Sequence, residues 1–327
     1  MIVLSTMEAP NTNSASLPPD EDLTEVRKPA SLLIAQFFLF PLIIIGLCVG
    51  IFLFFGYLTY EQRTPADYLG DIRSGTGTQR WQAAFELSNA VKSNPERVRT
   101  PAFVESLLTA YKDSPDEDIR VRRYLALILG EMKERSAVPA LVEELNRAER
   151  LKTIDWSQKG GFQFLRPSLA TIADDLVQDQ IYTLWALGSI GDNSAVPGVM
   201  EQVKNQDASV RKIAAYVAGV LGDPRAVEGL LPLLSDPKED VRWNAALALA
   251  LLGNADGTDL LMKLLDHSYA ETLLDITVEE KNQLRVNSIK ALAKLKHEPA
   301  QEKIREVSEN DPVLAVRSAA LEALKTF

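Results

Sequence analysis

The feature that most constrains the fold of this chain is an internal repeat with a period of about 31 residues. Arg211 recurs one period later as Arg242. Gly191, Gly222 and Gly253 are separated by the same interval. More divergent copies of the motif occur on both sides of these units. A fixed period of this length is typical of a solenoid, in which each repeat covers the apolar face of the next one.

Each repeat has the local pattern of a helical hairpin. Apolar residues recur at helical spacing over residues 210–221. Gly222 suits a left-handed helix end, Asp223 can cap the next helix, and Pro224 suits its first turn because no backbone donor is needed there. Alanine pairs such as Ala214 and Ala215 allow neighbouring helices to approach closely. The repeat is therefore predicted to be two helices joined by a tight turn.

These residues resemble a known family. The pattern Val-Arg-x-x-Ala-Ala, followed by Leu-Gly-Asp-Pro-Arg-Ala-Val and Leu-x-x-Leu-Leu, is similar to HEAT repeats in the short form also found in phycobilin lyases. The resemblance covers residues 65–327. It implies an all-α fold, a right-handed α-solenoid of about seven HEAT-like hairpins over residues 61–327, with a concave surface that binds proteins. It does not imply lyase activity, because the same repeats occur in many unrelated scaffolds.

A long apolar segment precedes the repeats. Residues 30–60 contain no charged side chain, and as a helix they would extend about 45 Å, against about 30 Å of bilayer hydrocarbon. We therefore predict a single transmembrane helix, uncleaved because the tail that precedes it is longer than the charged start of a signal peptide. The tail, residues 1–29, is acidic and without periodicity, and is predicted to be disordered. Gly46 and Gly50 form a small-xxx-small pair that can pack against a second helix.

The charges beside this segment are nearly balanced. Arg27 and Lys28 adjoin it on one side, and Arg63, Arg73 and Arg80 follow on the other. Because the adjoining pair is nearer, the positive-inside rule favours a cytoplasmic tail and an extracytoplasmic repeat domain. We expect a single-pass protein of a bacterial cell membrane.

An arginine recurs at one position of the repeats, and Gln180 takes the place of the third. One interpretation is an anion-binding ladder. The other, which we favour, is structural, with each guanidinium bridging to carboxylates or carbonyls of an adjacent repeat. The predicted ladder is Arg80, Arg122, Arg211, Arg242, Arg285 and Arg317.

Two insertions interrupt the repeat, near residues 149–175 and 267–282. The spacing predicts that each insertion separates the two helices of one hairpin, the third and the sixth, so that both emerge from one edge of the solenoid. The longer insertion holds Trp156, Phe162 and Phe164, which are candidate anchors for a protein partner. The alternative is that this loop folds back over its own helices.

Other chemistry is sparse. The net charge of −10 argues against nucleic-acid binding, which concentrates Lys and Arg. Two His and one Cys, Cys48 in the apolar segment, leave little for catalysis or metal binding. The pairs at 143–144 and 174–175 are interpreted as solvated carboxylates, and Trp81, Trp185 and Trp243 as core residues. We expect no catalytic residue, no metal and no cofactor.

The sequence thus predicts a non-enzymatic, membrane-anchored scaffold that binds a protein partner, itself membrane-associated, through a HEAT-repeat surface. The alternative is a membrane-tethered accessory of the phycobilin-lyase kind, which would handle a tetrapyrrole. The last predicted helix, residues 314–327, keeps apolar residues on an edge where a partner or another copy can dock.

Overall fold

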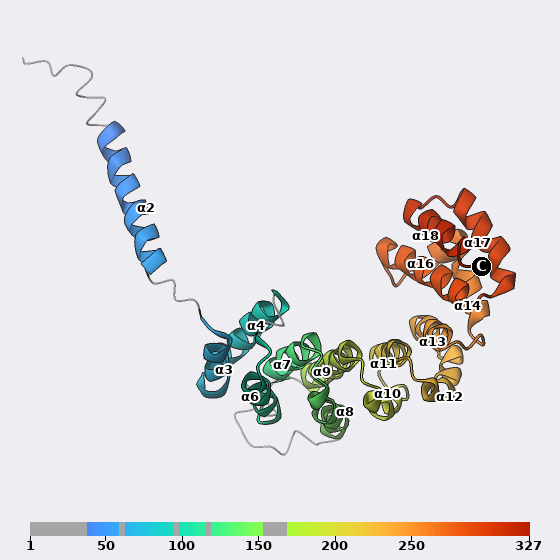
Figure 1. Ribbon diagram of the computed structural model, residues 1–327, viewed down its shortest axis with the longest axis horizontal. Helices are drawn as coiled ribbons and strands as arrows, with labels where there is room; N and C mark the ends of the chain where they lie inside the picture. Colours follow the sequence, from blue (N-terminus) through green and yellow to red (C-terminus); the bar gives the residue numbers. More distant parts are fainter. Residues whose placement is uncertain (1–37, 59–62, 94–97, 115–118, 153–168) are drawn as a thin grey trace, which may run out of the picture. The chain divides into compact units, whose positions relative to one another are not determined.

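The computed structural model describes residues 38–58, 63–93, 98–114, 119–152 and 169–327 (Figure 1). The chain divides into two compact units, residues 1–62 and 63–327. Within the described ranges the secondary structure is helical and contains no strand. The predicted all-α class is therefore confirmed for this part of the chain.

The first unit contains helix α2, Phe40–Leu58. None of its residues Phe40–Tyr57 is buried, and the helix is long and apolar enough to cross a membrane. A signal sequence near an N-terminus passes the same test of length and composition. Gly46 and Gly50 lie on this helix, and no atom of the described residues comes within 4 Å of a Cβ placed on either of them.

The second unit is a series of helices in two rows, which we call A helices and B helices. The helix α3 (Pro65–Ser74) precedes them. The A helices are α4 (Gly77–Ser93), α7 (Ile119–Glu131), α9 (Leu169–Ile190), α11 (Ala208–Leu221), α13 (Glu239–Leu251), α16 (Val278–Lys294) and α18 (Leu314–Leu324). The B helices are α6 (Pro101–Lys112), α8 (Val138–Lys152), α10 (Val196–Gln202), α12 (Val227–Leu230) with the 3-10 helix η7 (Leu231–Ser235), α14 (Thr258–Leu264) and α17 (Glu298–Asn310).

Each A helix packs against the next A helix, so the repeats form a continuous stack. Figure 1 shows α7, α9, α11 and α13 along one side of this stack and α8, α10 and α12 along the other. The hydrophobic core runs between the two rows through most of the unit.

The turn between α11 and α12 has the predicted chemistry. Gly222 ends α11 in a left-handed conformation with φ of 71°. The Asp223 carboxylate accepts a hydrogen bond of 2.9 Å from the backbone N–H of Arg225, and Pro224 begins the 3-10 helix η6 (Pro224–Ala226). The hairpin predicted from these three residues is confirmed.

Small residues set the distance between neighbouring A helices. A Cβ on Gly130 of α7 would lie 2.9 Å from Cα of Ala186 in α9. A Cβ on Gly219 of α11 would lie 2.7 Å from Cα of Ala248 in α13. Real Cβ atoms do not approach so closely, so the backbones of adjacent repeats touch at these glycines.

The two insertions lie between hairpins, and the prediction that each separates the helices of one hairpin was wrong. Residues 153–168 connect α8 to α9, and residues 265–277, which include helix α15 (His267–Glu271), connect α14 to α16. In both cases a B helix precedes and an A helix follows, so both insertions do occur at the same kind of connection. The repeat period locates the arginine-bearing helices but does not show on which side of each the tight turn falls. Trp156, Phe162 and Phe164 lie outside the described residues.

Candidate functional site

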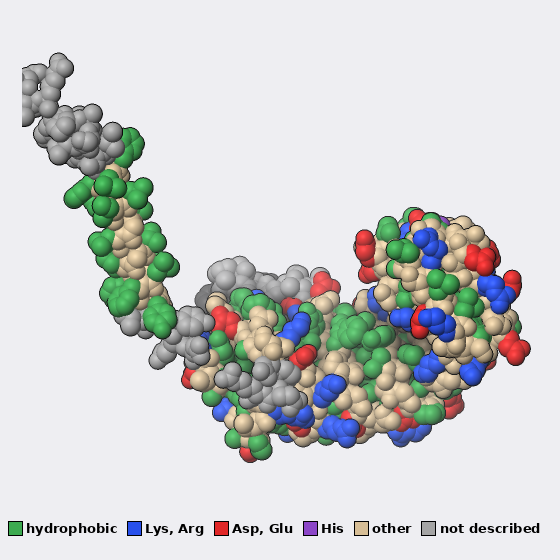
Figure 2. Space-filling view, turned by 45° about the horizontal axis from the view of Figure 1, so that its top comes forward, with side chains coloured by type: hydrophobic (Ala, Val, Ile, Leu, Met, Phe, Trp, Pro, Cys, Tyr) green, Lys and Arg blue, Asp and Glu red, His purple; other side chains and the backbone are tan. Residues whose placement is uncertain are grey.

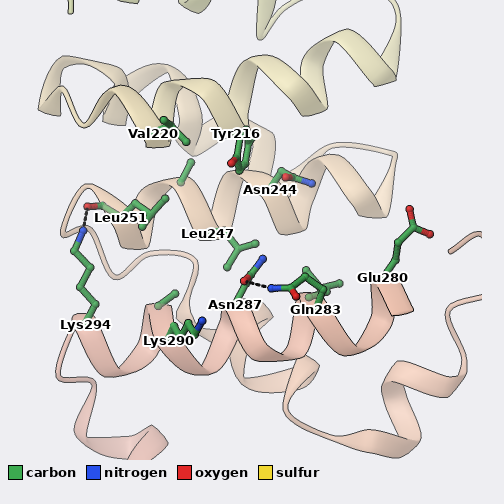
Figure 3. A pocket seen from close by; sticks show the side chains of 13 residues that line it. Tyr216, Val220, Asn244, Leu247, Leu251, Glu280, Gln283, Asn287, Lys290 and Lys294 are labelled. Atoms are coloured by element: carbon green, nitrogen blue, oxygen red, sulfur yellow. Dashed lines mark hydrogen bonds between the residues drawn. The ribbon is translucent and has the colours of Figure 1, made fainter. Parts of the chain in front are cut away.

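A groove with a cavity volume of about 500 Å³ runs along three A helices, α11, α13 and α16 (Figure 3). One wall is apolar except for Asn244 of α13. Its apolar side chains include Tyr216 and Val220 from α11 and Leu247 and Leu251 from α13. Tyr216 is 39% exposed, Val220 44% and Leu251 38%. We call this surface the apolar wall.

The opposite wall comes from α16 alone and is mostly polar, with Leu284 and Ala291 between its polar residues. Its polar residues follow one another at intervals of three or four positions, which places them on one face of the helix. We call this surface the polar wall: Glu280, Gln283, Asn287, Lys290 and Lys294.

Three hydrogen bonds hold the polar wall in place. The side-chain amide of Gln283 donates to Oδ1 of Asn287 at 2.8 Å, and Nζ of Lys294 donates to the carbonyl of Leu251 at 2.8 Å. The Glu280 carboxylate accepts from the backbone N–H of Thr277 at 2.8 Å, which lowers the pKa of Glu280. The Lys294 bond joins the two walls at the end where α13 terminates.

Aromatic side chains extend the exposed surface beyond the groove. The ring of Trp185 on α9 lies 5.1 Å from that of Tyr216. Trp185 is 39% exposed, so the prediction that it is a core residue was wrong, whereas Trp243 is buried as predicted. Figure 2 shows hydrophobic side chains gathered in the hollow beside the C-terminal repeats. Adjacent exposed apolar residues of this kind mark interaction surfaces.

The groove was missed in the sequence because its residues belong to the same helical pattern as the core. Val220 falls at core spacing in α11, and nothing local distinguishes it from its buried neighbours Val217 and Leu221. The one available signal was the run of polar residues on α16, which makes one face of that helix mostly polar.

The repeated arginines share one contact. In each case a guanidinium N–H donates to a backbone carbonyl at or near the end of the preceding B helix, or of α3 for the first arginine: Arg80 to Ile72 (2.7 Å), Arg122 to Ser114 (3.0 Å), Arg211 to Asn205 (2.8 Å), Arg242 to Asp236 (2.8 Å), Arg285 to Leu265 (3.0 Å) and Arg317 to Asp311 (2.5 Å). Carbonyls at a helix end lack the intrahelical donor that carbonyls inside the helix have. Gln180 instead is buried and donates to Gln202.

Some of the arginines also bind a carboxylate at the end of the B helix of their own hairpin. Arg211 makes two hydrogen bonds to Asp236, of 2.8 Å and 3.0 Å. Burial alone would raise the pKa of Asp236, but hydrogen bonds from Arg211 and from the Lys238 backbone hold it below its ordinary value. Arg285 binds both oxygens of Asp311, and only 1% of the Arg285 side chain is exposed. An external anion cannot reach a guanidinium that is buried in this way.

A second group of charged side chains is buried where α6, α7, α8 and α9 meet. Glu144 of α8 accepts from Arg122 at 3.1 Å and from Arg147 at 3.1 Å, while Oδ2 of Asp179 on α9 lies 3.9 Å from Arg122. Burial raises the pKa of Glu144 to about 8, against the attraction of Arg122. Burial also raises the pKa of Asp179. The interpretation of Glu144 as a solvated carboxylate was therefore wrong.

In the other acidic pair Asp174 is exposed, as predicted, whereas Asp175 is less open. Asp175 is half-buried and accepts from Nη2 of Arg123 at 2.9 Å. In the part of the chain that the structure describes, no group of three or more His, Cys, Asp or Glu is arranged to hold a metal ion. His267 lies beside Arg285, with 3.4 Å between Nδ1 and Nη1.

Comparisons with known proteins agree with the repeat architecture. The description "HEAT repeats" matches residues 163–236, 197–273 and 227–325, and "PBS lyase HEAT-like repeat" matches residues 121–147. No curated protein matches the chain. Among solved structures, the complex of CpcE and CpcF of phycocyanin lyase from Nostoc sp. PCC7120 is similar at 18% identity with a TM-score of 0.49, over 82% of this chain and 96% of that chain. From the two matched repeat descriptions, the chain carries HEAT-like repeats, stacked as a helical solenoid.

Proposed function

We propose that this protein is a non-catalytic, membrane-anchored scaffold that binds a protein partner through the groove on α11, α13 and α16. The observation that carries the proposal is the apolar wall, where Tyr216, Val220 and Leu251 stay exposed side by side. Burying a fully exposed side chain of this size contributes about 1.5–3 kcal/mol. Each of these three is already more than half buried, so a partner that covers the remaining surface gains about 1 kcal/mol per side chain.

The anchor in this proposal is α2. Its apolar span, Phe40–Tyr57, has no charged residue and no buried side chain within the described residues. Arg27 and Lys28 favour a cytoplasmic tail and an extracytoplasmic solenoid. The net acidic composition argues against a nucleic acid as the partner.

A membrane test uses the full chain in its native cell. The intact protein is expected to stay in the membrane pellet after alkaline carbonate extraction, and a variant lacking residues 30–60 is expected in the supernatant. Recovery of both variants in the supernatant would contradict the anchor. Protease added to sealed cells distinguishes the two orientations, because only an extracytoplasmic solenoid is digested.

The alternative function is an accessory that handles a tetrapyrrole. It is favoured by the likeness of residues 121–147 to the PBS lyase repeat and by the groove volume, which falls within the range of about 300–1,000 Å³ usual for small-molecule sites. This function requires visible absorbance of the purified protein. A colourless preparation that carries a protein partner would contradict it.

The binding test is affinity purification from the native cell in mild detergent. The intact protein is compared with V220D, which puts a charge on the apolar wall, and with E228K, which changes the charge of an exposed B-helix residue outside the groove. One partner is expected with the intact protein and with E228K, and not with V220D. Equal recovery with all three would contradict binding through the groove.

A further inference from the structure

We propose that the occupant of the groove is an amphipathic α-helix of about four turns, with an acidic residue placed against Lys290 and Lys294. This inference rests on the proposed scaffold function and identifies the chemistry of its partner. Three properties of the groove support it, namely the polarity of its two walls, its length and its charges.

The two walls differ in polarity, so the occupant must also have two faces. The apolar wall presents Tyr216, Val220 and Leu251 to the groove, and the polar wall presents amides and ammonium groups from α16. A uniformly apolar segment would desolvate Gln283 and Asn287 without replacing their water. A helix with one apolar stripe satisfies both walls, since its apolar face can pack on α11 and α13 while its polar face meets α16 and solvent.

The length of the groove fits several helical turns. Its lining on α16 extends from Glu280 to Lys294, which are 14 positions apart. At 1.5 Å rise per residue this is about 21 Å, or about four turns of a bound helix lying alongside. The lining residues on α11 and α13 also recur at intervals of three and four, a spacing that matches the ridges of a partner helix.

The charges distinguish the two ends of the groove. Glu280 at one end is already engaged in the cap of its own helix through Thr277. Lys290, at the other end, is exposed and makes no ion pair within the described residues. Lys294 uses one N–H on the Leu251 carbonyl and retains two further donors. An acidic side chain at this end therefore meets two ammonium groups, in a chain that is otherwise net acidic.

The first experiment identifies the segment that occupies the groove. A photoreactive benzoylphenylalanine replaces Val220 in the full-length protein, or Glu228 on the B-helix side as the control, and cross-linked peptides from the native cell are sequenced. The expected peptide comes only from the Val220 position. It has apolar residues at i, i+3, i+4 and i+7, with Asp or Glu within one turn of an end. A peptide without this period, or the same peptide from both positions, would overturn the proposal.

The second experiment tests the charge pairing with that identified peptide as the probe. K290E is expected to weaken its binding to the purified protein at least tenfold, and K204E, the same charge change on an exposed lysine outside the groove, is expected to leave it unchanged. Replacing the acidic residue of the peptide with Lys is expected to restore binding to K290E. Absence of that rescue would overturn the acidic assignment.

Different results contradict the scaffold function and the helical occupant of the groove. If V220D releases the co-purified partner but the cross-linked segment is not an amphipathic helix, the scaffold function stands and the helix is wrong. If no protein cross-links at Val220 and none co-purifies, both are wrong.

Discussion

Replacing Arg285 with Ala is expected to destabilise the C-terminal repeats strongly. The Arg285 guanidinium is buried between α14 and α16, binds both carboxylate oxygens of Asp311, and donates to the carbonyls of Leu264 and Leu265. Because Asp311 is also buried, the variant leaves a carboxylate without its counter-charge. Breaking such a buried pair costs about 3–5 kcal/mol. For a unit of this size, that lowers Tm by about 10 °C.

The matched control is R242A, at the same position of another repeat. Arg242 is partly exposed and reaches the carbonyl of Asp236 and the carboxylate of Glu239 near the surface. Its loss is expected to cost about 1 kcal/mol, the usual net value of a hydrogen bond. Circular dichroism at the helical minimum gives the Tm of each variant. Hydrogen exchange of α16 to α18 shows whether the loss of stability in R285A is confined to these helices, as expected for a stack of repeats.

A second variant separates the charge from the packing of the arginine. D311N in the R285A background removes the unpaired charge while keeping an acceptor for the backbone N–H of Val313, which donates to Asp311 at 2.9 Å. The double variant is expected to be more stable than R285A alone. Equal Tm values for the intact protein and R285A would refute the structural role of the ladder, and a double variant no more stable than R285A would refute the electrostatic part.

Two further predictions concern the rest of the solenoid. Since Glu144 has a folded pKa of about 8 and an ordinary value of 4.5, the folded state holds the extra proton between these values, and the free energy of unfolding is expected to fall by up to about 1.4 kcal/mol per pH unit as pH rises from 5 to 8. E144Q should reduce this slope in urea titrations, and the raised pKa of Asp179 accounts for the slope that remains. An unchanged slope contradicts the assignment. G219A is expected to lower the free energy of unfolding by about 1–3 kcal/mol, because the new Cβ meets the backbone of α13. G70A on α3 has open space around its new Cβ and is expected to be neutral or stabilising. Equal effects of the two variants in thermal melts would contradict the close packing of α11 on α13.

The repeat, its helices and the turn at Gly222 were determined by the sequence alone because each depends on residues close together in the chain. Helical spacing, a glycine with positive φ at 222 and the Asp223 cap act within one or two turns. The recurrence of these signals at a fixed distance was sufficient to predict a stack of hairpins. No tertiary contact was needed for that step.

Exposure and burial were decided only by the tertiary structure. Val220 and Val217 have the same local pattern, yet Val220 opens into the groove because no neighbouring helix covers it, while Val217 is buried. In the sequence, Glu144 has the pattern of a surface carboxylate. In the structure, Asp179 of α9 lies beside it, and the packing of four helices removes water from both carboxylates. In a solenoid each helix is covered on the sides where other repeats pack, and which sides those are depends on residues far away in the chain.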